Sequence, residues 1–305
     1  MSKLIQFPKS LLKNLMDGNK LVISIPYGWF ILLVAIPILI VVKISLSEME
    51  QTSISSILNW SEGWPKVKLN FSSYLFIASD ALYIKTYFSS IGYALTTTLL
   101  CLLIGYPFAY FMARSPKHLQ PMLLMLIMLP FWTSFLLRIY AWKTLLVGNG
   151  VINNLLMSMH VITTPLEMMN NSFSLLIGLV YSYLPFMILP LYANLSKLDL
   201  RYLEAAADLG AGPFKAFWLI TVPLSKAGII AGSMLVFIPA LGEYVIPELL
   251  GGPSSLMIGR VLWDEFFSNN DWPMASAVAV VMILIVLIPM AFFNKFQASQ
   301  AKGIA

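Results

Sequence analysis

One stretch of this chain combines an acid with small residues and helix breakers at defined spacings. Glu204 is followed by alanines at 205–207 and then by Gly210, and the pattern ends at Ile220 and Pro223. A carboxylate beside alanines can dock on another protein, because small side chains let a second surface approach closely. The pattern therefore predicts a docking site rather than a catalytic centre.

A second candidate centre is Glu243, the one acid inside a long apolar region. A carboxylate is costly there unless it faces protein or a watery cavity. Glu243 therefore either lines a path for a cationic substrate or serves as an ion-pair partner or helix-end cap. Aromatic rings nearby would bind ammonium groups through cation–π contacts, although each also fits a plain core or membrane-interface position. The aromatic candidates are Tyr244, Trp132, Tyr140, Tyr181, Tyr183 and Trp142.

Missing motifs exclude several classes of function. The sequence has no Gly-x-x-x-x-Gly-Lys-Ser/Thr loop for ATP and no Gly-x-Ser-x-Gly nucleophile elbow. Cys101, His118 and His160 are its only cysteine and histidines, too few for a zinc cluster. We therefore expect no catalytic residue and no metal site, and the chain is not predicted to be an enzyme.

The composition predicts an all-α integral membrane protein. Of 305 residues, 59% are hydrophobic and 11% are charged, with a mean hydropathy of +0.81, whereas soluble domains carry about 25% charged residues. A membrane-crossing helix needs about 20 apolar residues. Six such helices are predicted, at 21–42, 89–112, 121–137, 173–192, from 228 onward, and at 274–293.

Two features of the fifth predicted helix bear on its packing. Pro239 and Gly242 interrupt it and would free backbone carbonyls, which indicates either a substrate-lining break or a simple kink. Gly228 and Gly232 form a Gly-x-x-x-Gly pair, which predicts close packing against another helix.

The distribution of charge predicts the orientation. Twelve of the 19 Lys and Arg residues, but only four of the 14 acids, fall on the same side as the amino terminus. Basic residues favour the cytoplasm, so both termini and the Glu204 loop are predicted to be cytoplasmic. The net charge of +5 then reflects membrane flanks and not nucleic-acid binding.

These expectations divide the chain into five parts. The predicted parts are a cytoplasmic segment at 1–20, a first membrane helix at 21–42, a periplasmic loop at 43–85, a core of five membrane helices at 86–293 with a cytoplasmic loop at 195–226, and a cytoplasmic tail at 294–305. Within the cytoplasmic loop, residues 196–209 lack Gly and Pro and predict a helix. Gly210 would end that helix in a left-handed conformation, and Pro213 would start the next one.

The loop resembles the signature of permease subunits of ATP-binding-cassette importers. Their pattern is Glu-Ala-Ala, three residues, Gly, nine residues, Ile, one residue, Leu-Pro. It is matched by Glu204, Ala205, Ala206, Gly210, Ile220 and Pro223, with Val222 in place of Leu. The resemblance implies a type I importer permease fold in a bacterial inner membrane, and it implies that this loop couples to an ATPase subunit.

A closer resemblance concerns the substrate. Residues 232–252, 257–260 and 271–273, together with Leu129-Pro130-Phe131-Trp132 and 138–142, are similar to permease subunits of bacterial polyamine importers, nearest to the first permease subunit of the putrescine system. This implies a second homologous permease, two ATPase subunits and a periplasmic polyamine-binding protein. ATP and Mg would belong to the ATPase and no cofactor to this chain. Import of another small solute, or a secondary transporter working alone, is the alternative.

Overall fold

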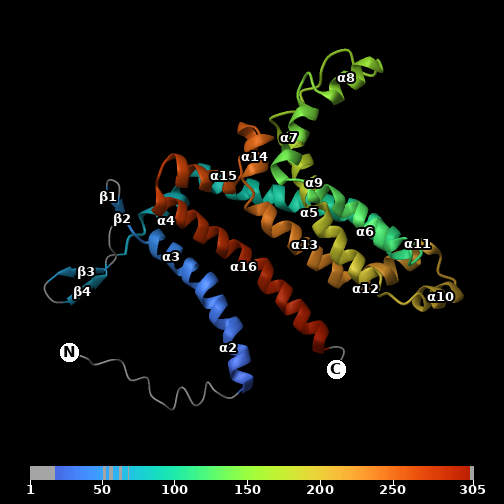
Figure 1. The fold of residues 1–305 in the computed structure, drawn as a ribbon, viewed down its shortest axis with the longest axis horizontal. Coiled ribbons are helices and arrows are strands. Elements are labelled where there is room, and N and C mark those ends of the chain that lie inside the picture. Colours follow the sequence, from blue (N-terminus) through green and yellow to red (C-terminus); the bar gives the residue numbers. More distant parts are fainter. Residues whose placement is uncertain (1–17, 51–52, 55–57, 62–63, 68, 303–305) are drawn as a thin grey trace.

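The computed structural model describes residues 18–50, 53–54, 58–61, 64–67 and 69–302. Its first membrane-length helix is built from α2 (Gly18–Phe30), a π turn η1 (Ile31–Ala35) and α3 (Ile36–Ser45). Its side chains are largely exposed, and α3 packs on α16 (Figure 1). The helix extends beyond the predicted 21–42 at both ends, and the hydroxyls of Ser45 and Tyr74 lie 2.6 Å apart where it stops.

The segment between the first two long helices holds two small antiparallel hairpins and a short helix. The two hairpins are formed by β1 with β2 and by β3 with β4. The next long helix begins at Ala81, so this segment is shorter than the predicted 43–85. The elements are β1 (Met49–Glu50), β2 (Ser53–Ile54), β3 (Leu58–Ser61), β4 (Trp64–Val67) and α4 (Ser72–Ser79).

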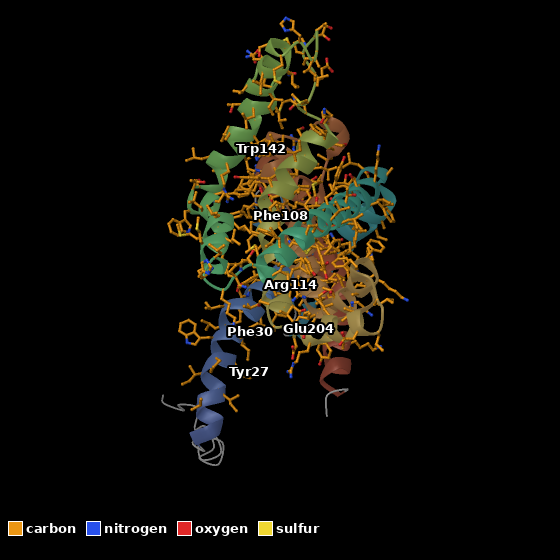
Figure 2. All side chains as sticks on the ribbon, turned by 90° about the vertical axis from the view of Figure 1, so that its right-hand side faces the viewer. Tyr27, Phe30, Phe108, Arg114, Trp142 and Glu204 are labelled. Atoms are coloured by element: carbon orange, nitrogen blue, oxygen red, sulfur yellow. The ribbon has the colours of Figure 1, made fainter. Side chains whose placement is uncertain are left out.

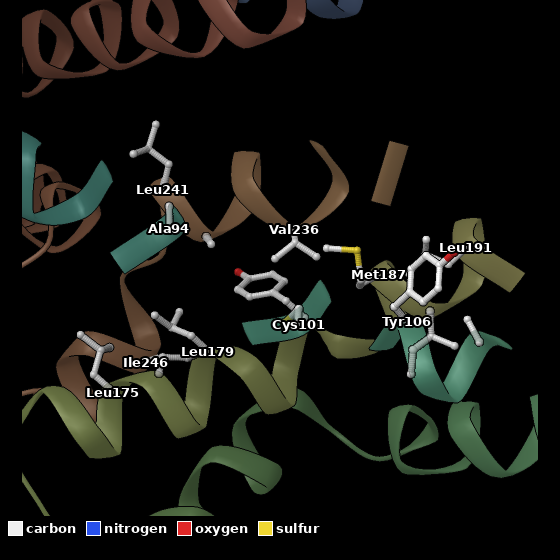
Figure 3. Close-up of a cluster of buried hydrophobic side chains, with 14 of the residues drawn as sticks. Ala94, Cys101, Tyr106, Leu175, Leu179, Met187, Leu191, Val236, Leu241 and Ile246 are labelled. Atoms are coloured by element: carbon white, nitrogen blue, oxygen red, sulfur yellow. The ribbon is translucent and has the colours of Figure 1, made fainter. Parts of the chain in front are cut away.

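Three helices form the core of the bundle. They are α5 (Ala81–Arg114), α9 (Ser172–Leu195) and α13 (Lys226–Leu241), which pack on one another along their lengths. Their contact surfaces hold fully buried apolar side chains such as Met187 and Val236 (Figure 3). A Cβ on Gly232 would lie 2.8 Å from the Met187 sulfur, so the predicted close packing of the glycine pair is confirmed.

The predicted third membrane helix is wrong in its bounds. Instead of one helix over 121–137, the chain forms α6 (Gln120–Met128) and a 3-10 turn η2 (Leu129–Trp132), and then leaves helical geometry at Thr133. The Thr133 hydroxyl donates to the Pro130 carbonyl at 2.7 Å, which caps the turn. Residues after the break belong to α7 (Phe135–Leu146), which is followed by α8 (Val151–Ser158).

The last third of the chain bends twice before its final long helix. After α13 come α14 (Val245–Leu249), a 3-10 turn η4 (Pro253–Ser255), α15 (Ile258–Trp263), a π turn η5 (Asp264–Ser268) and α16 (Trp272–Lys302). Five of the described helices are long and apolar enough to cross a membrane, and the bent pair Pro213–Leu224 and Lys226–Leu241 would make a sixth. The prediction of an all-α membrane protein is confirmed.

The two ends of the bundle carry different elements. The start of α2, the end of α16 and the short helix α10 lie at one end, and α8 lies at the other (Figure 1). A second view agrees, since Tyr27 and Glu204 lie toward one end and Trp142 toward the opposite end (Figure 2). The Glu204 loop therefore shares a side of the protein with both ends of the described chain.

Candidate functional site

The loop between α9 and α13, residues 196–225, is folded into short helices. After α9 ends at Leu195, residues 196–200 form turns, so the helix predicted over 196–209 is shorter than expected. Its elements are α10 (Arg201–Asp208), α11 (Pro213–Ala216), a π turn η3 (Phe217–Thr221) and α12 (Val222–Leu224). Pro213 occupies the first position of α11, as predicted from its missing N–H.

Gly210 ends α10 in the way the sequence predicts. Its φ is +80°, in the left-handed region that favours glycine. The Gly210 N–H donates to the Ala207 carbonyl and the Ala211 N–H to the Ala206 carbonyl, both at 2.9 Å. These two bonds satisfy carbonyls that the helix end leaves free, which is the Schellman arrangement. The turn sets the direction in which the chain continues from α10 toward α11.

The coupling residues predicted on α10 divide between two faces. Ala206 is 6% exposed and faces the rest of the loop, whereas Glu204 and Ala205 are exposed. Among the described residues, no hydrogen bond or ion pair engages the Glu204 carboxylate. This face of α10 therefore presents an open charge beside a small side chain.

An ion pair between Asp199 and Arg201 lies at the start of α10. The Asp199 carboxylate accepts hydrogen bonds from the Arg201 guanidinium, at 2.6 and 2.8 Å, and from its backbone N–H at 3.0 Å. These bonds to Arg201 lower the pKa of the Asp199 carboxyl below its usual value. Glu204, three residues further on, has no such partner.

The loop also exposes large apolar side chains. The rings of Phe214 and Trp218 pack edge to face, with centroids 6.3 Å apart. Contiguous exposed apolar surface of this kind marks a site that contacts another protein or a membrane. The exposed side chains are Leu209 at 89%, Phe214 at 76%, Leu219 at 65% and Trp218 at 53%.

Ile220 and Pro223 lie where the loop turns into α13. Ile220 is half-buried in η3 and Pro223 is exposed in α12. The segment Pro213–Leu224 meets α13 at an angle of 65°. At the bend, the hydroxyls of Ser225 and Tyr106 lie 2.8 Å apart, in a buried contact that ties the bend to α5.

The contact between Ser225 and Tyr106 could not be predicted from the sequence. The Tyr106 ring also packs on Phe217 with centroids 5.6 Å apart, and Tyr110 packs on the same ring at 5.7 Å. These residues come from α5 and from the loop, 119 positions apart for the hydroxyl pair. The one sequence signal for this contact is the serine that follows Val-Pro-Leu, and a serine alone does not indicate which residue it contacts.

Glu243 lies at a break between α13 and α14. Its Oε1 accepts hydrogen bonds from the backbone N–H groups of Tyr244 at 3.2 Å and Val245 at 3.0 Å, and the Tyr183 hydroxyl donates to its Oε2. Backbone groups freed at a helix break need such partners. The Glu243 carboxylate therefore caps the break and joins it to α9, and its place in a substrate path stays a prediction.

Aromatic packing continues from the break toward α15. The Tyr244 ring is stacked on Trp263 with centroids 4.4 Å apart and an interplanar angle of 7°. A Cβ on Gly259 would lie 2.4 Å from the Gly242 carbonyl oxygen, so α15 lies directly on the break. An ion pair of 2.7 Å between Arg260 and Glu248 joins α15 to α14.

The other predicted aromatic residues do not converge on Glu243. The Tyr181 ring packs on Trp142 with centroids 5.5 Å apart. Trp132 and Tyr140 expose 79% and 49% of their surfaces, and neither makes a ring contact with another described aromatic residue. The structure thus groups Tyr183 and Tyr244 with Glu243 and leaves the other four away from it, with Tyr181 and Trp142 packed on each other. In the described part of the chain, no three His, Cys, Asp or Glu side chains form a metal-binding group.

Solved structures share the overall fold. The chain is similar to a subunit of a bacterial ABC transporter involved in the import of alginate, with a TM-score of 0.61 and 17% identity, covering 95% of this chain and 99% of that one. It is also similar to a chain of the MetNI methionine ABC transporter, with a TM-score of 0.54 and 11% identity, covering 71% and 94%. At these identities the likeness concerns the fold alone.

Curated relatives cover nearly the whole chain. The "Spermidine/putrescine transport system permease protein PotB" of Haemophilus influenzae is 38% identical over 92% of this chain and 94% of its own length. The protein of the same name from Escherichia coli is 38% identical over 85% and 90%. The "Inner membrane ABC transporter permease protein YdcU" of Escherichia coli is 31% identical over 68% and 70%.

The family model "Binding-protein-dependent transport system inner membrane component" matches residues 102–301. This range begins within α5 and includes the 196–225 loop, the Glu243 break and α16 up to residue 301. The chain belongs to this family. It is an inner membrane permease component of a transport system and not an enzyme.

Proposed function

We propose that this chain is a permease subunit of an ATP-driven importer of polyamines, with putrescine or spermidine as substrate. The support is its likeness to PotB proteins, at 37–38% identity over 85–92% of the chain. In this proposal the chain forms half of the translocation path, and a second homologous permease forms the other half. The special likeness to the first permease subunit of the putrescine system stays a prediction.

The observation that carries this proposal is the geometry of α10. An exposed carboxylate, an exposed alanine and a Schellman turn lie at one end of the bundle, with exposed apolar residues beside them. We assign this surface to the docking of an ATPase subunit, with a second ATPase under the other permease. ATP and Mg then bind in the ATPases, and this chain holds no cofactor of its own.

The orientation follows from the same assignment. The α10 end, which also carries the start of α2 and the end of α16, faces the cytoplasm, as the positive charge at the chain ends favours. The opposite end then faces the periplasm, where a polyamine-binding protein delivers the substrate.

Helix α13 is the mechanical connection between the two candidate sites. It starts at the Ser225 bend beside the loop and ends at the Gly242–Tyr244 break, 16 residues and about 24 Å away. When ATP binding draws the ATPases together, α10 and the bend move with them. Because the buried Tyr106–Ser225 contact ties the bend to α5, the movement reaches α5 and α13 together and changes access at the break.

The substrate path in this proposal runs past the break. A carboxylate has about four acceptor positions, and the Glu243 carboxylate uses three of them while it caps α14. It therefore still attracts an ammonium group. Tyr244 and Tyr183 lie beside it, and Trp132, Tyr140 and Tyr181 remain candidates for the surface shared with the second permease.

Reconstitution of the assembled complex tests the proposal. Vesicles that hold both permeases, both ATPases, the binding protein and internal ATP are expected to accumulate labelled putrescine or spermidine, and each polyamine should compete with the other. Vesicles without ATP serve as the control. Accumulation of neither polyamine would remove the substrate from the proposal. Transport by this chain alone, without ATPases, would instead indicate a secondary transporter.

A further inference from the structure

An apolar groove runs along the bundle surface directly beside the 196–225 loop. Its volume is about 410 Å³. One wall comes from α5, and the other comes from η3, α12 and the first turn of α13. The residues that matter for the argument are Leu99, Leu103, Phe217, Trp218, Val222 and Ile229. Because three of these belong to the loop, whatever fills the groove touches both the loop and α5.

The groove is exposed beside a membrane-crossing helix. Leu99 and Leu103 expose 64% and 68% of their surfaces on that helix, and Trp218 exposes 53%. Because its lining is apolar, the groove suits an aliphatic chain. A polar ligand would lose its hydrogen bonds there without replacement.

Three basic residues, on α5, α11 and α13, lie close to residues that line the groove, either in space or along the helix. The Arg114 guanidinium lies 5.3 Å from the Tyr110 ring centroid, and that ring contacts Phe217 of the groove wall. Lys215 precedes Trp218, and Lys226 precedes Ile229, by three positions each, which places each lysine one helical turn from the lining.

These cations have no ion-pair partner in the part of the chain that the structure describes. No acid among the described residues forms an ion pair with any of the three, and the buried Nη2 of Arg114 has no hydrogen-bond partner there. Lys215 and Lys226 are exposed. The apolar groove and the cationic end together match one kind of molecule, which has an aliphatic chain and an anionic head.

We propose that the groove binds one acyl chain of an anionic phospholipid, whose headgroup is held by Arg114, Lys215 and Lys226. An apolar protein segment would fill the groove but leave the three cations unpaired, so the charges favour the lipid. The bound lipid holds η3 and α12 against α5, and in this respect the proposal rests on the proposed coupling role of the loop. Binding itself does not depend on that role.

Lipid retention by the purified assembled complex tests the binding. The complex is placed in nanodiscs of phosphatidylcholine alone or with added phosphatidylglycerol, and bound lipid is measured by native mass spectrometry after release. We expect selective retention of phosphatidylglycerol. Replacing Lys215 and Lys226 with Gln together should weaken retention by about fivefold for each cation removed. Ile229→Trp, which fills the groove, should abolish it.

A second apolar groove supplies the matched control. It has a volume of about 340 Å³, and its lining includes Leu95, Met234 and Ile285. No basic residue lies within five positions of any residue in its lining. Leu95→Trp should therefore leave phosphatidylglycerol retention unchanged. Equal retention of both lipids, or equal effects of Ile229→Trp and Leu95→Trp, would overturn the proposal.

Uptake measurements separate this inference from the proposed function. In phosphatidylglycerol vesicles the Lys215→Gln, Lys226→Gln double variant should import less polyamine per ATP hydrolysed, down to the level of the unchanged complex in phosphatidylcholine. If lipid is retained selectively but no polyamine enters under any condition, the proposed substrate fails and the lipid site stands. If import is normal but no variant alters lipid retention, the lipid site fails and the proposed function stands.

Discussion

The 196–225 loop and the Glu243 break both interrupt membrane-crossing helices, but they differ in whether the glutamate they carry is hydrogen-bonded. At the break, Glu243 accepts three hydrogen bonds from within the chain. On the loop, Glu204 is exposed, and no described residue bonds to its carboxylate. The hydrogen bonds at the break come from this chain, whereas the carboxylate on the loop is unbonded among the described residues, as the proposed docking of an ATPase requires. Substitutions in the loop should therefore reduce transport without lowering stability, whereas substitutions at the break should lower both.

The sharpest test of this contrast is Glu204→Lys. We expect polyamine uptake to fall by about 30-fold or more, because losing one partner of a docked charge pair costs about 2 to 5 kcal/mol. The thermal stability of the isolated permease should not change, since the exposed Glu204 side chain bonds to no described residue. Uptake in vesicles, co-purification of the ATPase and the thermal midpoint in detergent are the three measurements.

Asp208→Lys is the matched control for Glu204→Lys. It makes the same charge change one turn further along α10, also on an exposed residue, but outside the six positions of the coupling pattern. Its effect on ATPase co-purification should be smaller. Equal losses from both variants would mean that the loop presents a diffuse charge rather than a docking residue.

Glu243→Gln should produce the opposite pattern, with stability affected as much as transport. The amide keeps one acceptor oxygen but places an NH2 donor where Tyr183 or the backbone N–H groups already donate. Hydrogen bonds to a charged group contribute about 1.5 to 3 kcal/mol each. We expect a lower thermal midpoint in detergent together with reduced uptake.

Two tyrosine variants distinguish a capping role of Glu243 from a role in the substrate path. Tyr183→Phe removes one donor and leaves the Glu243 charge in place, while Tyr181→Phe on the same helix removes a hydroxyl that bonds to no described residue. If Glu243 only holds the break, Tyr183→Phe and Glu243→Gln should lower stability and leave the KM for polyamine alone. A raised KM in Glu243→Gln but not in Tyr183→Phe would place the charge in the path.

Gly210→Ala is a smaller test of how the loop is shaped. A non-glycine residue in the left-handed region costs about 1 to 2 kcal/mol, and nothing lies within 4 Å of the added Cβ. The strain alone should therefore disturb the turn and reduce coupling several-fold, measured as polyamine imported per ATP hydrolysed. Gly212→Ala is the control, because its Cβ also meets nothing while its φ is −65°. Equal effects would show that the left-handed conformation of Gly210 does not determine the coupling.

Sequence reasoning succeeded where the signal was local. Long apolar runs are enough to predict membrane helices, and the loop turned as Gly210 and Pro213 require. The predicted helix over 196–209 was too long because the Asp199–Arg201 pair stabilises a turn before α10. The third membrane helix was placed as one piece because its apolar run continues past Trp132, and Thr133 gives no strong signal of the break.

The candidate sites were predictable only in part, for a physical reason. Glu243 was found because a carboxylate in an apolar run is conspicuous, but its Tyr183 partner lies 60 positions away and is one of several tyrosines. The contact between Ser225 and Tyr106 spans 119 positions. Such pairings depend on how α5, α9 and α13 pack, and a single sequence does not display that packing.

The smallest expected effect concerns the ion pair between Glu248 and Arg260, which joins α14 to α15 near the break. Its side chains are 53% and 29% exposed, so solvent screens it, and such pairs contribute about 0.2 to 1 kcal/mol. A double-mutant cycle with Glu248→Gln and Arg260→Gln, followed by thermal unfolding, should return a coupling energy in that range. A coupling energy well above this range would mean that the Glu248–Arg260 ion pair, and not the Glu243 hydrogen bonds, stabilises the helix break. Glu243 would then be available to contact the substrate.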